Sequence, residues 1–165
     1  ILITQNQAFQ MQTCNSQVRM QLNFNHPVIE LIWAVRRQCQ ERCNNWFNYS
    51  GIDNRDPVVS AALYLNNQSR FSSKPGTWFR LVQPYQHHTN VPEAFVYCFS
   101  FALYPEDTTS PSGSCNFSRI DNASLQLVVS ANAVGGNKTA KVRVYAINYN
   151  VLRVMSGMGG LAYAN

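Results

Sequence analysis

Regular alternation of apolar and polar residues is the clearest signal in the sequence. In Gln17–Phe24, apolar residues fall on one side of an extended chain and polar residues on the other. The same period of two recurs in Ser124–Ala131 and in Lys141–Tyr149, and Val151–Met155 can prolong the latter. Such segments are typical of half-buried strands. The residues expected to point inward are Val18, Met20, Leu22, Phe24, Leu125, Leu127, Val129, Ala131, Val142, Val144 and Ala146.

Three further segments are apolar with little alternation. Val28–Val35, Val58–Leu65 and Ala94–Tyr104 are rich in Val, Leu and aromatic residues, so they predict strands with both faces covered. Thr77–Val82 is the one segment whose apolar spacing fits a helical turn, and Pro84 is expected to end it.

Long, turn-rich connections separate these strands. Gln38–Asp56 and Glu106–Asn116 are polar loops, and Asn66–Pro75 is an excursion between strands. Val134–Asn137 carries a Gly-Gly pair and predicts a turn, and the Gly-rich Gly157–Asn165 predicts a tight turn near the C-terminus. Seven or eight strands with such connections predict an all-β fold, an antiparallel eight-stranded jelly-roll sandwich.

Composition narrows the class of protein. The 165 residues are 45% hydrophobic and 12% aromatic but only 13% charged, and 18 Asn and 12 Gln supply much of the polarity. This balance excludes a disordered chain and a solvated coiled coil. The net charge of +5 is scattered and its longest basic run is Arg36-Arg37, so no sequence-specific contact with nucleic acid is expected.

No targeting or membrane-spanning segment is expected. Ile1–Met11 lacks the basic start and unbroken apolar stretch of a signal peptide. The longest apolar segment, Ala94–Tyr104, is far shorter than the roughly 20 residues that span a bilayer. We therefore expect no membrane insertion. The chain starts at Ile1 rather than at Met, which fits a piece of a longer protein.

Residues that could carry catalysis or bind metal are present but poorly arranged. The five Cys include only one close pair, Cys39 and Cys43, with no second pair at zinc-site spacing, so free thiols are expected. His87 and His88 are adjacent and would point to opposite faces of a strand. Glu106 and Asp107 are neighbours in a loop and are expected to be solvated. We therefore predict no catalytic residue, metal site or cofactor.

Five Asn-x-Ser/Thr sequons mark possible glycan attachment. Asn-rich turns that also contain Ser explain part of that number, so glycosylation is a hypothesis at this stage. The candidate residues, all in expected loops, are Asn48, Asn67, Asn116, Asn122 and Asn137.

Five segments, in this order and spacing, resemble the C-terminal part of the major capsid proteins of nucleocytoplasmic large DNA viruses. They read FNHPVIELIW, QPYQHHT, FALYPE, PSGSCNFSRID and YAINYNVLRVMSGMGGLAYAN. Their positions are Phe24–Trp33, Gln83–Thr89, Phe101–Glu106, Pro111–Asp121 and Tyr145–Asn165. The resemblance spans about Gln17 to Asn165. We therefore expect residues 17–165 to form a single jelly roll, and residues 1–16 to be an N-terminal segment or a linker from a preceding domain.

The resemblance implies a structural role rather than an enzymatic one. Members of this family carry two jelly rolls in one chain and form trimeric, pseudo-hexagonal capsomers. Those capsomers tile an icosahedral shell, in contact with neighbouring capsomers and minor capsid proteins. The resemblance also implies that the protein is located in the virion capsid, after assembly in the host cytoplasm. This chain resembles the second jelly roll only, so the first is removed, disordered or in another chain.

Two alternatives of other classes stay open from the residues alone. A carbohydrate-binding jelly-roll module could stack sugars on the aromatic residues Trp46, Tyr49, Trp78 and Tyr85. A metal-dependent jelly-roll enzyme would need bound iron, manganese or zinc. Neither alternative explains the C-terminal match at Tyr145–Asn165.

Overall fold

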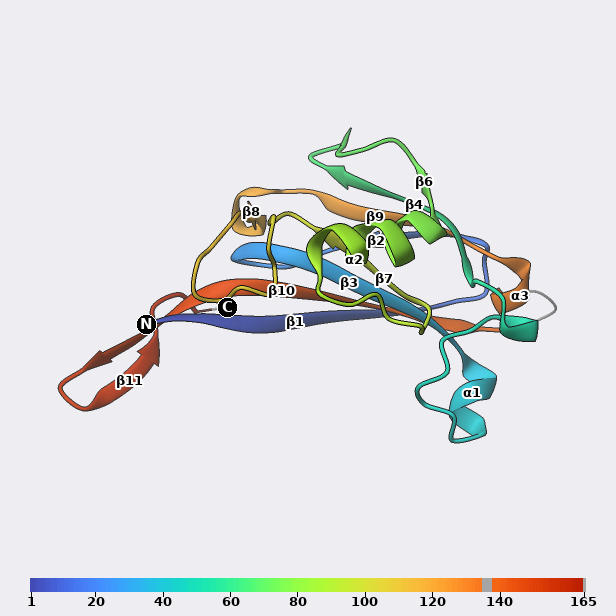
Figure 1. Ribbon diagram of the computed structural model, residues 1–165, viewed down its shortest axis with the longest axis horizontal. Helices are drawn as coiled ribbons and strands as arrows, with labels where there is room; N and C mark the ends of the chain where they lie inside the picture. The colour runs from blue at the N-terminus through green and yellow to red at the C-terminus, as the bar shows by residue number, and fades with distance from the viewer. Residues whose placement is uncertain (135–137, 165) are drawn as a thin grey trace.

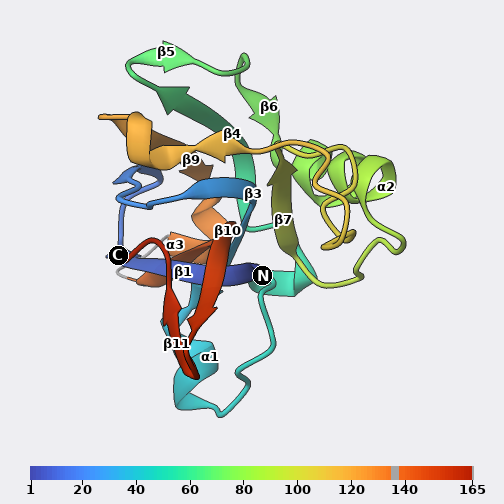
Figure 2. The same ribbon diagram turned by 90° about the vertical axis from the view of Figure 1, so that its left-hand side faces the viewer.

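Two antiparallel sheets pack face to face around one apolar core (Figures 1 and 2). The computed structural model describes residues 1–134 and 138–164. The first sheet runs, in spatial order, β1 (Leu2–Thr13), β10 (Ala140–Met155), β3 (Pro27–Arg37) and β7 (Val96–Ser100). The second runs β2 (Gln17–Gln21), β9 (Ala123–Val129), β4 (Val58–Leu65) and β5 (Gln68–Ser69).

Short elements complete the sheets and their connections. Strand β8 (Cys115–Asn116) pairs with β3, β6 (Lys74–Pro75) with β4, and β11 (Met158–Leu161) with β10. The helices and helical turns are α1 (Gln38–Arg42), η1 (Ile52–Asn54), η2 (Trp78–Val82), α2 (Gln83–His87), η3 (Phe117–Arg119) and α3 (Ala131–Val134). Apart from β4 with β5 and β6, and β10 with β11, paired strands are far apart in sequence, so most connections cross from one sheet to the other. The predicted antiparallel jelly-roll sandwich is confirmed.

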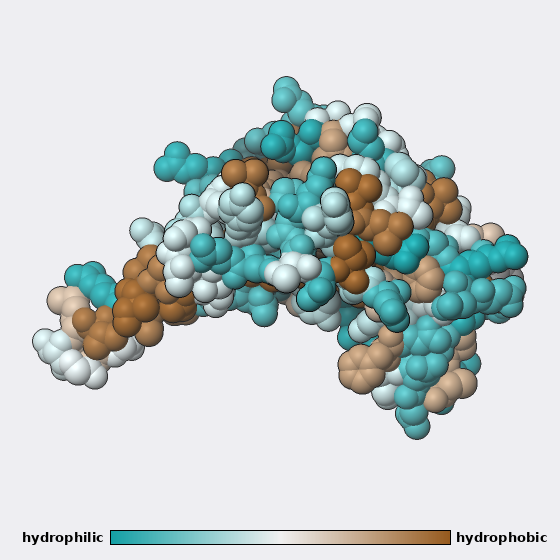
Figure 3. Space-filling model, in the orientation of Figure 1, coloured by the Kyte–Doolittle hydropathy of each residue, from teal (hydrophilic) through white to brown (hydrophobic). Residues whose placement is uncertain are grey.

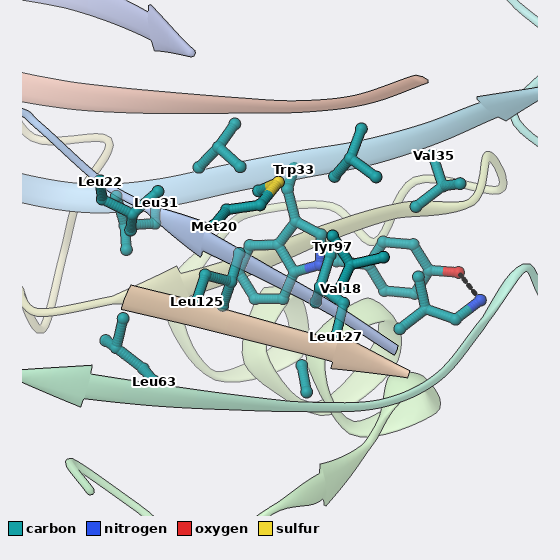
Figure 4. Close-up of a cluster of buried hydrophobic side chains, with 14 of the residues drawn as sticks. Val18, Met20, Leu22, Leu31, Trp33, Val35, Leu63, Tyr97, Leu125 and Leu127 are labelled. Carbon is teal, nitrogen blue, oxygen red and sulfur yellow. Dashed lines mark hydrogen bonds between the residues drawn. The ribbon is translucent and has the colours of Figure 1, made fainter. Parts of the chain in front are cut away.

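The alternation in the sequence correctly predicts which side chains enter the core. Ten of the eleven residues expected to point inward are buried, and the exception is Ala131, which begins α3. The centre of the core is aromatic (Figure 4). The Trp33 ring stacks on Tyr97 at a centroid distance of 6.1 Å and meets the edge of Phe79 at 5.1 Å. The apolar faces of β3 and β7 therefore join that of helical turn η2.

A buried tyrosine ties the two sheets together at one end. The Tyr97 hydroxyl donates to the Asp56 carboxylate and accepts a hydrogen bond from the Val58 amide over 3.3 Å (Figure 4). Burial raises the pKa of Tyr97 above its usual range, and the neighbouring Asp56 raises it further. Asp56 also pairs with Arg80 over 3.2 Å. Strand β7 of the first sheet is thereby joined to the start of β4 in the second.

The N-terminal residues form a strand where the sequence indicated a segment or linker. All twelve residues of β1 pair with β10, from Leu2 opposite Val151 to Thr13 opposite Ala140. Gln and Asn are interspersed among the apolar residues of β1, and its outer edge has no partner strand among the described residues. Residues 2–13 therefore belong to the first sheet.

Two other predicted elements have different limits. The strand expected over Ala94–Tyr104 is only Val96–Ser100, because the chain turns away from the sheet at Phe101. Pro84 does not end the helical turn: it lies in the first turn of α2, where its missing N–H is not needed. The expected loop over Gln38–Asp56 contains α1 and η1. The predicted turn at Val134–Asn137 falls mostly outside the described residues.

Candidate assembly surface

Exposed apolar side chains gather in three places on the surface (Figure 3). We name them the hairpin arm (Leu152–Leu161), the helical patch and the α1 lobe (Gln38–Phe47). The helical patch consists of Leu81, Val82, Tyr85, Val91, Leu103 and Tyr104. Contiguous exposed apolar surface on a soluble domain is typical of a contact site. These three places are therefore the candidate surfaces for contact with other protein.

The hairpin arm is an extension of the first sheet beyond the body. Strand β10 continues past its last partner in β1 and pairs only with β11, from Leu152 opposite Leu161 to Met155 opposite Met158. Ser156 and Gly157 turn the chain with positive φ angles of 50° and 79°. Figures 1 and 3 show the arm projecting from the body with apolar residues over much of its length. The sequence predicted a tight turn here, but not a projecting hairpin.

The helical patch lies on η2 and α2, which flank β7, the outer strand of the first sheet (Figure 2), and on the connections that follow α2 and β7. The Gln83 side chain accepts a hydrogen bond from the Ser100 amide over 3.1 Å, so it satisfies a backbone donor of this strand. A ring nitrogen of His87 lies 3.0 Å from the Leu103 carbonyl oxygen. These contacts hold α2 and the loop that contains Leu103 against the body, so the backbone that carries the patch is held by hydrogen bonds.

Below the patch, one histidine links two carboxylates. The His88 Nε2 atom lies 2.9 Å from Glu30 Oε2, and its Nδ1 atom lies 3.2 Å from Glu106 Oε1. The Thr89 amide and hydroxyl also donate to Glu106. Because both ring nitrogens face carboxylate oxygens, the His88 ring bridges Glu30 and Glu106. Glu106 is therefore paired, and its side chain is also 48% exposed to solvent, as expected for a loop carboxylate.

The pKa values of the two carboxylates are shifted in opposite directions, one by burial and the other by hydrogen bonds. Burial raises the pKa of Glu30, and the nearby His88 only partly offsets this effect. Hydrogen bonds from Thr89 lower the pKa of Glu106, and His88 lowers it further. The cluster holds the loop after β7 against β3, and so it has a structural role.

We expect Glu30→Gln to flatten the decline of stability with rising pH. Because the Glu30 pKa is raised in the folded state, its proton is held more tightly there than in the unfolded chain. Its contribution is thus fully present below about 4.5 and is lost as the pH rises through the folded value, with a slope of at most about 1.4 kcal/mol per pH unit. Denaturation of both proteins between pH 4 and 8 measures the difference in slope.

The matched control for this prediction is Glu93→Gln, which removes an exposed carboxylate. Its stability profile should keep the wild-type slope. Parallel wild-type and Glu30→Gln profiles above pH 4.5 would contradict the prediction.

A hollow of about 280 Å³ lies beside this cluster, with a largely apolar lining. His88 and Cys98 both line it, although no local pattern in the sequence indicated that a histidine and a cysteine would share a site. Burial raises the pKa of the Cys98 thiol to about 12, and the charge of Glu30 adds to the effect. The thiol is therefore protonated at neutral pH and is a poor nucleophile. The lining residues are Ile32, Pro84, His88, Asn90, Pro92, Val96 and Cys98.

Residues proposed for metal binding or sugar stacking are not brought together. Within residues 1–134 and 138–164, no three His, Cys, Asp or Glu side chains are grouped as a metal site would need. Trp46 lies under the Arg36 guanidinium, 5.1 Å from ring centroid to Cζ, whereas Trp78 packs on Phe71 and Phe79. Tyr85 stands exposed on α2. These aromatic residues therefore form no common platform.

The sequons lie at turns and strand ends. Asn67 is exposed in the β4–β5 turn, and Asn122 is exposed just before β9. The side-chain oxygens of Asn48 and Asn116 accept hydrogen bonds from the amides of Ser50 and Ser118, within their own sequons. Asn137 lies outside the described residues.

Comparison with known proteins identifies the family. The family model described as large eukaryotic DNA virus major capsid protein matches residues 1–160. The chain belongs to this family. The major capsid protein of Chrysochromulina ericina virus is 67% identical over 110 residues, which cover 67% of this chain and 19% of that protein. The major capsid protein of Paramecium bursaria Chlorella virus 1 is 36% identical over 195 residues, covering 93% and 44%.

Solved capsid structures agree with the fold. The chain matches the PBCV-1 virus capsid with a TM-score of 0.82 and 36% identity, over 100% of this chain and 51% of that one. The Faustovirus major capsid protein matches with a TM-score of 0.80 at 13% identity, which supports the fold alone. The chain thus spans about half or less of the capsid proteins that it resembles. Among the described helices, none is long and apolar enough to cross a membrane.

Proposed function

We propose that this chain is the C-terminal jelly roll of a longer major capsid protein and that it acts structurally, without a catalytic residue or cofactor. One observation carries the proposal: the whole chain superposes on half of a PBCV-1 capsid chain at 36% identity. On this proposal, residues 17–165 are the body of the jelly roll. Residues 1–16 bring the chain in from a preceding domain and contribute β1.

The complete protein would form homotrimers of pseudo-hexagonal outline that tile an icosahedral shell. Its partners would be other copies, neighbouring capsomers and minor capsid proteins, in a virion assembled in the host cytoplasm. The hairpin arm, helical patch and α1 lobe support this proposal, because exposed aromatic and aliphatic residues are typical of protein contacts. Amides along β1 can make wet contacts without the cost of burying charge.

The native mass of the full-length protein from virions tests this proposal. A trimer is expected, with a protomer well over twice the mass of this 18.7 kDa chain. A monomer with no assembled form would contradict it, as would a protomer no longer than this chain.

Glycan attachment is a separate proposal for the five sequons, and peptide mass mapping of virion-derived protein tests it. A glycan on an exposed residue such as Asn67 or Asn122 would add its mass to one tryptic peptide. An unmodified intact mass would contradict attachment at every site, including Asn48, Asn116 and Asn137.

A further inference from the structure

Past its root at Leu152, the hairpin arm is exposed along its whole length. Val154, Met158 and Leu161 are 59%, 74% and 47% exposed. A Cβ added at Gly159 or Gly160 would meet nothing within 4 Å. A two-stranded hairpin without a covered face is at best marginally stable in water. The arm therefore has the character of a contact element that lacks the surface it contacts.

The start of the chain lies at the root of the arm (Figure 1). The Ile1 amino nitrogen donates to the Leu152 carbonyl oxygen over 2.8 Å, and the Leu152 amide donates to the Ile1 carbonyl oxygen, also over 2.8 Å. Ile1 and Leu2 are themselves 77% and 43% exposed, so they extend the apolar surface of the arm. Any polypeptide that precedes Ile1 must leave the body beside this surface.

The size of the half that is absent from this chain determines whether the hairpin arm can contact it. The chain covers 51% of the PBCV-1 capsid chain, so the other half is about as large as this one. A domain of that size has a radius of gyration of about 15 Å. The four residue pairs between β10 and β11 give the arm a reach of about 13 Å. A domain attached at the root is therefore within range, and a short tether gives it an effective concentration of millimolar order.

The surface of the arm suits an apolar partner. Arg153 is the one charged residue in Leu152–Leu161. Gly159 and Gly160 leave the backbone of β11 open to close approach. The outer edge of β11 also has no strand partner within the described chain, so its backbone groups can pair with an added strand.

We propose that the hairpin arm docks on the half of the protein that precedes Ile1 and so clamps the two halves of one protomer together. This inference rests on the proposed function, because it takes the preceding half to be present in the complete chain. The arm then acts within a protomer, and the helical patch and α1 lobe stay available for contacts between protomers.

Site-specific photo-crosslinking in the full-length protein tests the proposal. Benzoylphenylalanine replaces Met158 in the arm or, as a matched control, Val59, which is 55% exposed on β4 of the other sheet. We expect the Met158 probe to give a crosslink within one protomer, mapped by peptide mass to residues before Ile1. A product with the mass of two protomers would overturn the proposal, as would a yield no higher than that of the Val59 probe.

A second measurement uses the variants Met158→Asp and Val59→Asp in the same full-length protein. Met158→Asp should raise the rate of limited proteolysis at the junction before Ile1 about tenfold, because a charge replaces a buried apolar contact. Val59→Asp should leave that rate unchanged. Equal rates in both variants would also overturn the proposal.

The native mass of the same samples separates this inference from the proposed function. Trimers that lack the arm crosslink would overturn the clamp alone. A protomer no longer than this chain would overturn both.

Discussion

Trp33→Ala should lower the free energy of unfolding by about 3–5 kcal/mol. Trp33 is fully buried at the centre of the core, where it stacks on Tyr97 and meets the edge of Phe79. Its removal would leave a large cavity between elements that cannot collapse inward, since β3 is paired on both sides. The Trp33 indole nitrogen is buried without a hydrogen-bond partner in the described structure, so little polar stabilisation is lost with it. Chemical denaturation of the full-length protein measures the change.

The matched control is Trp46→Ala in the α1 lobe. Trp46 is 47% exposed, and its main contact is the Arg36 guanidinium over its ring. A contact of this kind contributes about 0.5–1 kcal/mol at an exposed site, so the loss should be several-fold smaller than for Trp33. Equal losses in the two variants would contradict the assignment of Trp33 to the centre of the core.

The strands with alternating apolar and polar residues were predictable because the apolar face of each strand must be buried away from water. Val18 and Met20 on β2, and Leu125 and Leu127 on β9, are buried as the period of two indicates. Where a strand is apolar on both faces, there is no alternation to indicate where the strand begins or ends. That is why Ala94–Tyr104 was expected to be extended throughout, whereas the strand covers only Val96–Ser100.

Strand β1 was missed because its polar residues are amides on both faces. Gln5, Gln7 and Gln10 lie in residues 1–16, which were expected to be an N-terminal segment or linker, yet each one is hydrogen-bonded to a residue far along the chain. The Gln7 side chain accepts a hydrogen bond from the Asn25 amide over 3.0 Å, and Gln10 accepts one from Arg143 over 2.7 Å. Pairing with β10 over twelve residues holds this strand in place, together with the partly buried Phe9, which packs against the core.

The carboxylate–histidine cluster could not be found from local patterns. Glu30, His88 and Glu106 are separated by 58 and 18 positions, and only the fold brings them together. One signal did exist, because each lies in a different one of the five segments that resemble the capsid family. Segments that are similar across a family and far apart in sequence are good candidates for contact in the fold. The hairpin arm gave a weaker signal, since its glycines predict a turn equally well.

Gly76→Ala is also expected to lower the free energy of unfolding strongly. Gly76 is buried between β6 and η2, where an added Cβ would lie 2.2 Å from the Val58 carbonyl oxygen and 3.1 Å from its carbonyl carbon. Both neighbours are backbone atoms of Val58 at the start of β4, and the amide of the same residue donates a hydrogen bond to the Tyr97 hydroxyl. Relief of the overlap must therefore move a strand rather than a side chain. Overpacking of this kind costs about 1–3 kcal/mol or more.

Gly159→Ala supplies the control for Gly76→Ala, because it adds the same methyl group where nothing lies within 4 Å. Its free energy of unfolding should stay within about 0.5 kcal/mol of wild type. Chemical denaturation of both full-length variants, with core fluorescence as the probe, measures the difference. Should Gly76→Ala be as stable as Gly159→Ala, the close approach of the β6–η2 connection to β4 would be contradicted. That approach closes the sandwich beside Trp33 and Phe79, so its loss would also loosen the support beneath the helical patch.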